Sequence, residues 1–251
     1  MLIPLRNYSN YSICESNIKI DDLVNFAEKE KLPAIALTDY KLLSGVLEFS
    51  IKCQKKGIQP IIGLDVDYLS ILKNYSRLTI LSKNENGFKN LNILSTKINT
   101  ENDFQLSLKN IKDFSDGNIL ILGGLYSYFE DLNINKNNFK LILDEINTLK
   151  KMFISDIFFE LDENLDNKLL NEISQKCNIN CFLSSFSFYK QDKDFDAIKI
   201  LHCLKNGEYL QNTSFKLKNN YSLTKSHQNI DKLSQLIQNS NLISNKINFL
   251  I

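Results

Sequence analysis

The sequence of 251 residues contains little arginine, histidine, proline or glycine and no tryptophan. Arg6 and Arg77 are the only arginines among 30 lysine and arginine residues. Arginine is the preferred side chain for bidentate contacts to phosphates and bases, so a nucleic-acid-binding groove is disfavoured. The formal net charge of +1 provides no overall attraction to nucleic acid or to a membrane surface. We therefore expect little direct nucleic-acid binding.

Long hydrophobic runs are also absent. No stretch reaches the roughly 18 consecutive apolar residues that a membrane helix needs, and the first residues lack the basic and apolar regions of a signal peptide. The odd number of cysteines argues against a disulfide framework and for a reducing compartment. The five cysteines are Cys14, Cys53, Cys177, Cys181 and Cys203. We expect a cytoplasmic protein that does not associate with membranes.

Histidine is too scarce for most acid–base and metal chemistry. His202 falls in a predicted helix and His227 in a polar stretch, and neither follows a predicted strand. An imidazole-based acid–base pair or metal site is therefore not expected. The Cys177-x-x-x-Cys181 pair lacks a second pair at zinc-site spacing, so buried structural thiols are favoured. The motifs of serine hydrolases, dinucleotide-binding proteins and P-loop proteins are also missing.

Short apolar runs rich in Ile, Val and Leu alternate with longer amphipathic segments. The apolar runs predict strands at 2–7, 34–39, 60–66, 77–82, 118–122, 157–161 and 180–185. Helical spacing predicts helices at 20–27, 46–53, 88–98, 141–149, 165–173, 195–204 and 230–247. Such alternation indicates parallel strands joined by crossover helices, either closed into a barrel or wound as an open sheet.

In both architectures the chemistry gathers at the carboxyl ends of the strands. Several carboxylates lie at these ends. They are Asp39, Asp65, Asp67, Glu160, Asp162 and Glu163. A pair such as Asp39 and Asp65 could serve acid–base catalysis or hold Mg²⁺. Aspartate at a strand end is also a common turn and helix-cap residue, and we weigh that interpretation above catalysis.

A series of short segments then becomes recognisable in order along the whole chain. The segments are Ser9-Asn-Tyr-Ser12, residues 32–39, 43–49, 57–63 and 81–91, Phe159-Glu160-Leu161, Asp196-Ala197, Cys203, Gly207 and Asn220-Tyr221. Together they resemble the PHP (polymerase and histidinol phosphatase) domain, in the form found at the N-terminus of the bacterial DNA polymerase III alpha subunit.

The resemblance implies an α/β fold, a distorted TIM-like (β/α)7 barrel. One domain would cover residues 1–251, with the barrel over about 1–215. A C-terminal helical segment over about 216–251 would lead to a polymerase body that this chain lacks. In active family members the strand ends hold metal ions that hydrolyse phosphoesters through an activated water.

Carried over position by position, most of the family's metal ligands are missing. H-x-H falls on Arg6-Asn7-Tyr8, T-D-H on Thr38-Asp39-Tyr40, G-x-E on Gly63-Leu64-Asp65, E-L-x-x-H on Glu160 to Asn164, and N-D-V-H on Ser185 to Phe188. The vestigial ligand positions are therefore Arg6, Tyr8, Asp39, Tyr40, Asp65, Asn164, Phe186 and Phe188. We expect no catalytic residue and no cofactor. If Mg or Mn binds at all, Asp39 and Asp65 would hold it.

Two physical expectations follow for this dismantled site. Arg6 should pair with Asp39 or Asp65, so that its charge replaces that of an ion. Phe186 and Phe188 should fill the vacated volume. Replacing Arg6 by alanine should then destabilise the fold.

The resemblance finally implies a role and its partners. The family's full-length protein is a DNA-directed DNA polymerase, but the expected role of this chain is a non-catalytic one. It would brace the polymerase and dock the proofreading exonuclease among other DNA polymerase III subunits. One alternative is a metal-dependent PHP-type phosphoesterase with a reduced metal site. Another is a stand-alone (β/α) enzyme with an unrelated carboxylate site.

Overall fold

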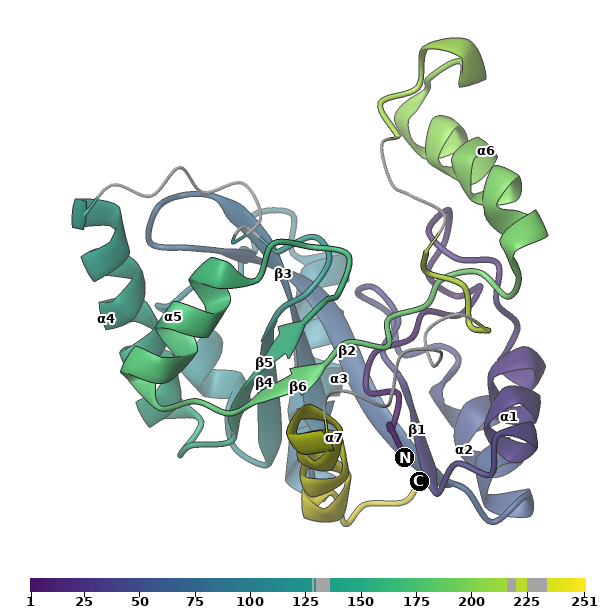
Figure 1. Ribbon diagram of the computed structural model, residues 1–251, viewed down its shortest axis with the longest axis horizontal. Helices are drawn as coiled ribbons and strands as arrows, with labels where there is room; N and C mark the ends of the chain where they lie inside the picture. The colour runs from purple at the N-terminus through teal and green to yellow at the C-terminus, as the bar shows by residue number, and fades with distance from the viewer. Residues whose placement is uncertain (128, 130–135, 216–219, 225–233) are drawn as a thin grey trace.

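A curled six-stranded sheet forms the centre of the protein (Figure 1). The computed structural model describes residues 1–127, 129, 136–215, 220–224 and 234–251. The strands lie side by side in chain order: β1 (Ala34–Leu37), β2 (Gln59–Leu69), β3 (Tyr75–Ser82), β4 (Asn118–Gly123), β5 (Ile157–Leu161) and β6 (Cys181–Leu183). The α/β class and the TIM-like arrangement expected from the sequence are confirmed.

The direction of one strand differs from the sequence-based expectation of an all-parallel sheet. β3 pairs antiparallel with both β2 and β4, whereas β1–β2, β4–β5 and β5–β6 are parallel pairs. Residues 70–74 join β2 to β3, and this connection is too short for a crossover helix, which needs about a dozen residues. The two strands therefore form a hairpin, in which Asp67 lies opposite Arg77.

The strand predicted at residues 2–7 is not a regular strand. The segment nevertheless runs beside β1, because Ala36 N donates to Pro4 O at 2.8 Å and Thr38 N donates to Asn7 O at 2.9 Å. A parallel bridge joins Asn7 to Ser187 after β6. Pro4 has no N–H to contribute to a ladder. The segment thus continues the curl of the sheet from β1 toward the chain after β6.

Most of the helices lie around the outside of the sheet. The helices are α1 (Ile20–Lys29), α2 (Val46–Lys55), α3 (Glu85–Thr100), α4 (Lys136–Met152), α5 (Lys168–Cys177), α6 (Phe195–Asn206) and α7 (Ser234–Lys246), with 3₁₀ turns η1 (Ile111–Phe114), η3 (Asp192–Asp194) and η4 (Leu210–Asn212). In Figure 1, α1 and α2 lie beside β1, α4 and α5 lie on the opposite side, and α6 stands apart from the body. α7 packs against β6. The predicted helix over 230–247 is observed from Ser234, and its first residues lie outside the described part.

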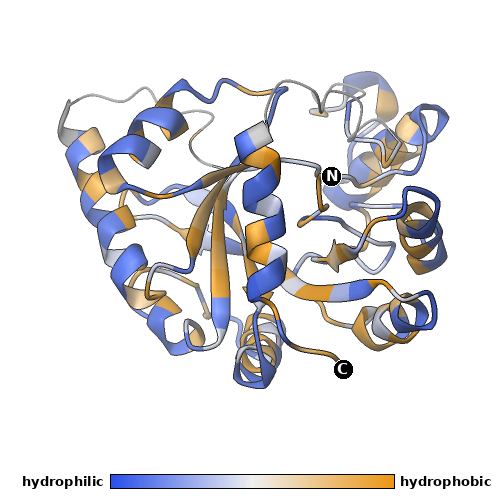
Figure 2. Ribbon diagram, turned by 60° about the horizontal axis from the view of Figure 1, so that its bottom comes forward, coloured by the Kyte–Doolittle hydropathy of each residue, from blue (hydrophilic) through white to orange (hydrophobic). Residues whose placement is uncertain are grey.

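The alternation of side chains along the strands divides the core into two parts. Ile35 and Leu37 of β1 pack among α1 and α2, whereas Ala34 and Ala36 face the inside of the curled sheet. The strands are accordingly among the most hydrophobic parts of the ribbon in Figure 2. Ile243 of α7 joins the interior cluster. No helix in the described ranges has both the length and the apolar character needed to cross a bilayer.

Candidate functional site

The buried guanidinium of Arg6 lies where the ends of several strands meet. Arg6 Nη2 lies 2.7 Å from Asp65 Oδ2, and Nη1 lies 3.0 Å from Glu160 Oε2 and 3.1 Å from Leu125 O. The guanidinium carbon is 4.5 Å from the ring centre of Phe186. Although burial itself favours the neutral form, Asp65 and Glu160 raise the pKa of Arg6 well above its ordinary value. We call this site, formed by Arg6, Asp39, Asp65 and Glu160, the barrel mouth.

Asp65 is fully occupied by hydrogen-bond donors. Besides Arg6, the hydroxyl of Tyr8 donates to Oδ2, and Thr79 Oγ1 donates to Oδ1 at 2.9 Å. Burial and the neighbouring Asp65 raise the pKa of Tyr8 well above its ordinary value, so Tyr8 keeps its proton and remains a donor. Three side chains thus satisfy a carboxylate that is closed to water.

Glu160 at the end of β5 is the second carboxylate of Arg6. Its Oε1 accepts a hydrogen bond from Ser184 Oγ at 2.7 Å. Burial, together with the nearby Asp162, raises the pKa of Glu160 above its ordinary value, although Arg6 acts in the opposite direction. Glu160 lay in the carboxylate-rich strand ends of the sequence, but its pairing with Arg6 was not foreseen.

Asp39 has a separate set of partners and does not pair with Arg6. Ser9 N donates to Oδ1 at 2.7 Å, Ser9 Oγ donates to Oδ2 at 2.6 Å, and Ser12 Oγ donates to Oδ1 at 2.6 Å. Burial raises the pKa of Asp39. Of the two alternative partners expected for Arg6, the structure therefore shows Asp65 and not Asp39, because the loop after the first segment already supplies Asp39 with donors.

Around this centre lies a second ion-pair network that the sequence analysis missed. Arg77 on β3 donates from Nη2 to Glu15 Oε1 at 2.7 Å and from Nη1 to the Tyr8 hydroxyl at 3.2 Å. Its guanidinium carbon also lies 3.9 Å from the ring centre of Tyr40, whose hydroxyl donates to Asp67 Oδ2 at 2.6 Å. The hairpin register places Arg77 opposite Asp67, and this register became visible only in the fold.

Phe186 and Phe188, which the resemblance aligns with ligand positions, are buried. Phe186 meets the ring of Tyr8 edge-on at 4.8 Å between centroids and lies 5.5 Å from Phe188. Phe188 in turn stacks on Tyr221 at 5.6 Å. These rings fill the space beside Arg6 with apolar atoms, as the sequence indicated.

Asn164, the remaining position that the resemblance aligns with a ligand, has partners other than the four residues of the barrel mouth. Asn164 donates from its backbone N and Nδ2 to Asp162 Oδ1, at 2.8 and 3.0 Å, and accepts from Asn220. His202 on α6 contacts Ser214 and Asn206, and His227 lies outside the described residues. Among the residues described, no three His, Cys, Asp or Glu side chains gather as a metal-binding group.

Comparison with known proteins gives consistent matches. Residues 4–164 match the profile of the PHP domain. The DNA polymerase III subunit alpha of Buchnera aphidicola from Acyrthosiphon pisum is 30% identical over 247 residues, which are 93% of this chain and 21% of that protein. The corresponding subunit of Borreliella burgdorferi is 28% identical over 228 residues, covering 82% of this chain and 19% of that protein.

The chain thus spans about a fifth of the length of these relatives. Among solved structures, an amidohydrolase from Chromobacterium violaceum aligns with a TM-score of 0.51 and 10% identity. The alignment covers 80% of this chain and 97% of that one. At this identity the similarity concerns the fold.

Proposed function

The chain belongs to the PHP domain family, and we propose that it serves as a non-catalytic framework domain of a DNA polymerase III alpha subunit. The domain would brace the polymerase, dock the proofreading exonuclease and other subunits of that complex in the cytoplasm, and bind no metal. Its similarity to DNA polymerase III alpha subunits over most of its length supports the assignment to that complex.

The observation that carries the proposal is the position of Arg6 between Asp65 and Glu160. A catalytic cluster of metal ions needs ligands that can offset its charge, and zinc-type ions prefer imidazole or thiolate. At this mouth the aligned imidazole positions carry Arg6, Tyr8, Tyr40, Asn164 and Phe188. The residues present therefore do not fit a metal cluster of the family's kind.

The carboxylates that remain are committed to other donors. To bind a divalent ion, Asp65 and Glu160 would have to lose the guanidinium as a partner. Otherwise the single charge of Arg6 and the double charge of the ion would be buried together. Separating a buried ion pair leaves an uncompensated charge and costs about 3–5 kcal/mol. Asp39, the other candidate for Mg or Mn, is held by Ser9 and Ser12. The carboxylates of the mouth are thus occupied by donors of the protein itself, without an ion.

Metal analysis tests this proposal directly. We expect protein dialysed against Mn²⁺ or Zn²⁺ to retain far less than one equivalent of metal, and to show no phosphatase or exonuclease turnover above background. The alternative, a phosphoesterase with a reduced metal site, requires stoichiometric metal and a turnover that is lost in Asp39→Asn. That result would overturn the framework role.

Co-purification tests the docking role separately. The tagged chain should retain the proofreading exonuclease subunit of the same organism on an affinity column at physiological salt. The Arg6→Ala variant, which we expect to be less stable, serves to show that retention depends on the folded domain. Passage of the exonuclease through a column of folded domain would remove docking from the proposal and leave the metal-free mouth to be judged on its own.

A further inference from the structure

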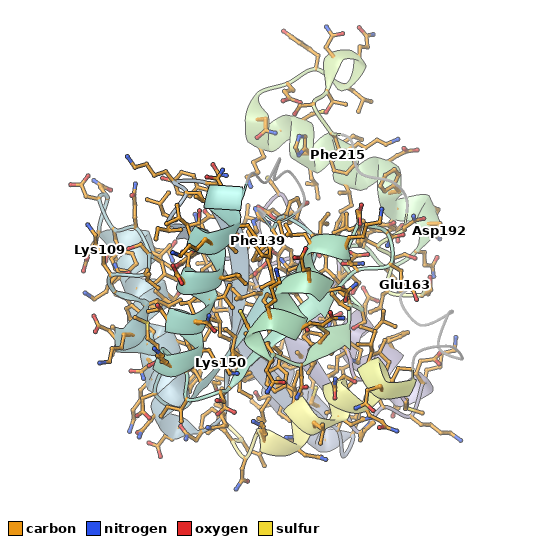
Figure 3. All side chains as sticks on the ribbon, turned by 60° about the vertical axis from the view of Figure 1, so that its left-hand side comes forward. Lys109, Phe139, Lys150, Glu163, Asp192 and Phe215 are labelled. Atoms are coloured by element: carbon orange, nitrogen blue, oxygen red, sulfur yellow. The ribbon has the colours of Figure 1, made fainter. Side chains whose placement is uncertain are left out.

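A pocket of about 300 Å³ lies between α6 and the barrel mouth. One wall comes from α6 and the residues after η4, including His202, Lys205 and Phe215. The opposite wall comes from the body of the domain, including Glu15, Arg77 and Tyr126. Figure 3 shows Phe215 alongside α6, on the part of the chain that stands away from the sheet. Neither Arg6 nor Asp65 lines this pocket, so it is distinct from the centre of the mouth.

Two permanent cations converge on one carboxylate in this pocket. Glu15 accepts from Arg77 Nη2 at 2.7 Å, and Lys205 Nζ lies 2.5 Å from the same carboxylate. The hydrogen bonds from Arg77 and Lys205 lower the pKa of Glu15 despite the opposing effect of burial, so Glu15 is ionised at neutral pH. The lining carries two cations and one carboxylate, with Asp67 3.8 Å from Arg77 Nε outside it, and this excess of positive charge in the lining favours an anionic ligand.

Aromatic rings form the apolar part of the lining. Tyr126 packs its ring 4.4 Å from the Arg77 guanidinium carbon. The ring of Phe215 lies 5.1 Å from that of His202, and Phe188 is buried behind them. Flat rings on several sides of a small cavity favour a planar group, because ring faces and edges interact well with one another.

The backbone of the pocket carries strain at two residues. Cys14 has φ = 60° and Tyr126 has φ = 69°, and both line the pocket. Residues with a side chain rarely adopt this left-handed conformation, although six other described residues outside the pocket also do. Arg77 N donates to Tyr126 O at 2.9 Å, which ties the strained turn to the strand that carries the cation.

We propose that this pocket binds a small organic phosphate with one planar base, of the size of a nucleoside monophosphate. The phosphate would take hydrogen bonds from Lys205 and Arg77, with His202 beside them, and the ring would lie among Tyr126, Phe188 and Phe215. The volume is at the lower limit for small-molecule pockets, which suits one base, its sugar and one phosphate but not a longer nucleotide chain. The proposal is independent of the framework role.

Calorimetric titration of the full chain with AMP, adenosine and inorganic phosphate tests each part of the proposal. We expect AMP to bind at one site. Adenosine and phosphate should each bind at least about tenfold more weakly than AMP, because each lacks one half of the ligand. Lys205→Ala should weaken AMP binding by about tenfold or more, the usual effect of losing a charge-assisted hydrogen bond. Lys199→Ala is the matched control, since Lys199 is on the same helix but pairs with Asp196 outside the pocket.

Glu15→Gln gives the sharpest test, since it removes the carboxylate that competes for both cations. Folded Glu15→Gln protein should bind AMP more tightly than the unchanged chain, whereas a purely structural role of Glu15 predicts weaker binding. The proposal is wrong if AMP gives no heat at millimolar concentration, if phosphate or adenosine binds as tightly as AMP, or if Lys205→Ala binds like Lys199→Ala. If Lys205→Ala does not fold, Phe215→Ala replaces it with the same expected loss. None of these outcomes depends on the metal content of the mouth.

Discussion

The guanidinium of Arg6 and the carboxylate of Asp65 form a salt bridge of 2.7 Å in which both side chains are at most 1% exposed. The two residues are 59 positions apart, so the pair fastens the N-terminal segment to the centre of β2. Removing two charges from water costs several kcal/mol per ion, and their attraction offsets this only when both partners are present. Removing only one of the two side chains should therefore lower the free energy of unfolding by far more than the intact pair contributes to it.

Arg6→Ala should lower the free energy of unfolding at pH 7 by about 3–5 kcal/mol. The substitution leaves Asp65 and Glu160 buried without their shared cation, in addition to removing the packing of the side chain against Phe186. Urea denaturation followed by circular dichroism measures the change. An unaltered midpoint would show that the guanidinium does not hold the mouth together.

Neutralising the stranded acids provides the control for this prediction. In the Arg6→Met background, Asp65→Asn together with Glu160→Gln should recover part of the lost stability, because no uncompensated charge remains. Loss of packing alone would leave the triple variant no more stable than Arg6→Met.

Gly124→Ala should destabilise the protein through both backbone and contact. Gly124 has φ = +67°, and a Cβ there would lie 2.1 Å from Glu160 Oε2 and 3.1 Å from Arg6 Nη1. Gly57 is a matched control, since its φ is +68° and nothing lies within 4 Å of the corresponding Cβ. Gly57→Ala should cost about 1–2 kcal/mol for the left-handed conformation alone. Gly124→Ala should cost clearly more, and equal costs in urea denaturation would contradict the close packing of Glu160.

Phe186→Ala should cost about 3–5 kcal/mol of unfolding free energy, as expected for removing a buried aromatic ring from a packed cluster. The ring contacts Tyr8, Phe188, Tyr221 and the Arg6 guanidinium. Phe186→Leu retains part of the apolar volume and should cost less. The same denaturation measurement applies, and a cost below about 1 kcal/mol for the alanine variant would mean that the ring does not fill the mouth.

Helix and strand positions could be predicted because burial imposes a period on the residues. Four apolar residues of α1, Ile20, Leu23, Val24 and Ala27, are buried, as their helical spacing predicted. The direction of a strand leaves no such mark on its own residues, which is why the reversal of β3 was not foreseen. Only the short connection at 70–74 carried that information.

At the mouth, the resemblance located Arg6, Tyr8 and Asp65 but not every partner. The resemblance also brought Glu160 to the mouth through the E-L-x-x-H segment, but it did not show that Arg6, 154 residues away, is its partner. Glu15 lies in a loop without periodic pattern, so its role between Arg77 and Lys205 required the fold. Contacts between side chains that meet only because the sheet is curled could thus not be predicted from the sequence pattern.

The two acids Glu160 and Glu15 should give stability opposite dependences on pH. Burial raises the pKa of Glu160, so between its ordinary value and its value in the fold the folded state holds a proton that the unfolded chain releases. Stability from this residue is therefore present at low pH and decreases as pH rises through that window. The pKa of Glu15 is lowered, so its contribution is present above the ordinary glutamate pKa and is lost as the solution becomes more acidic. Urea denaturation at a series of pH values should show that Glu160→Gln removes the decrease on the rising side, whereas Glu15→Gln removes the loss on the acid side. If both variants changed the free energy of unfolding in the same pH range, the two carboxylates could not have the environments described for them.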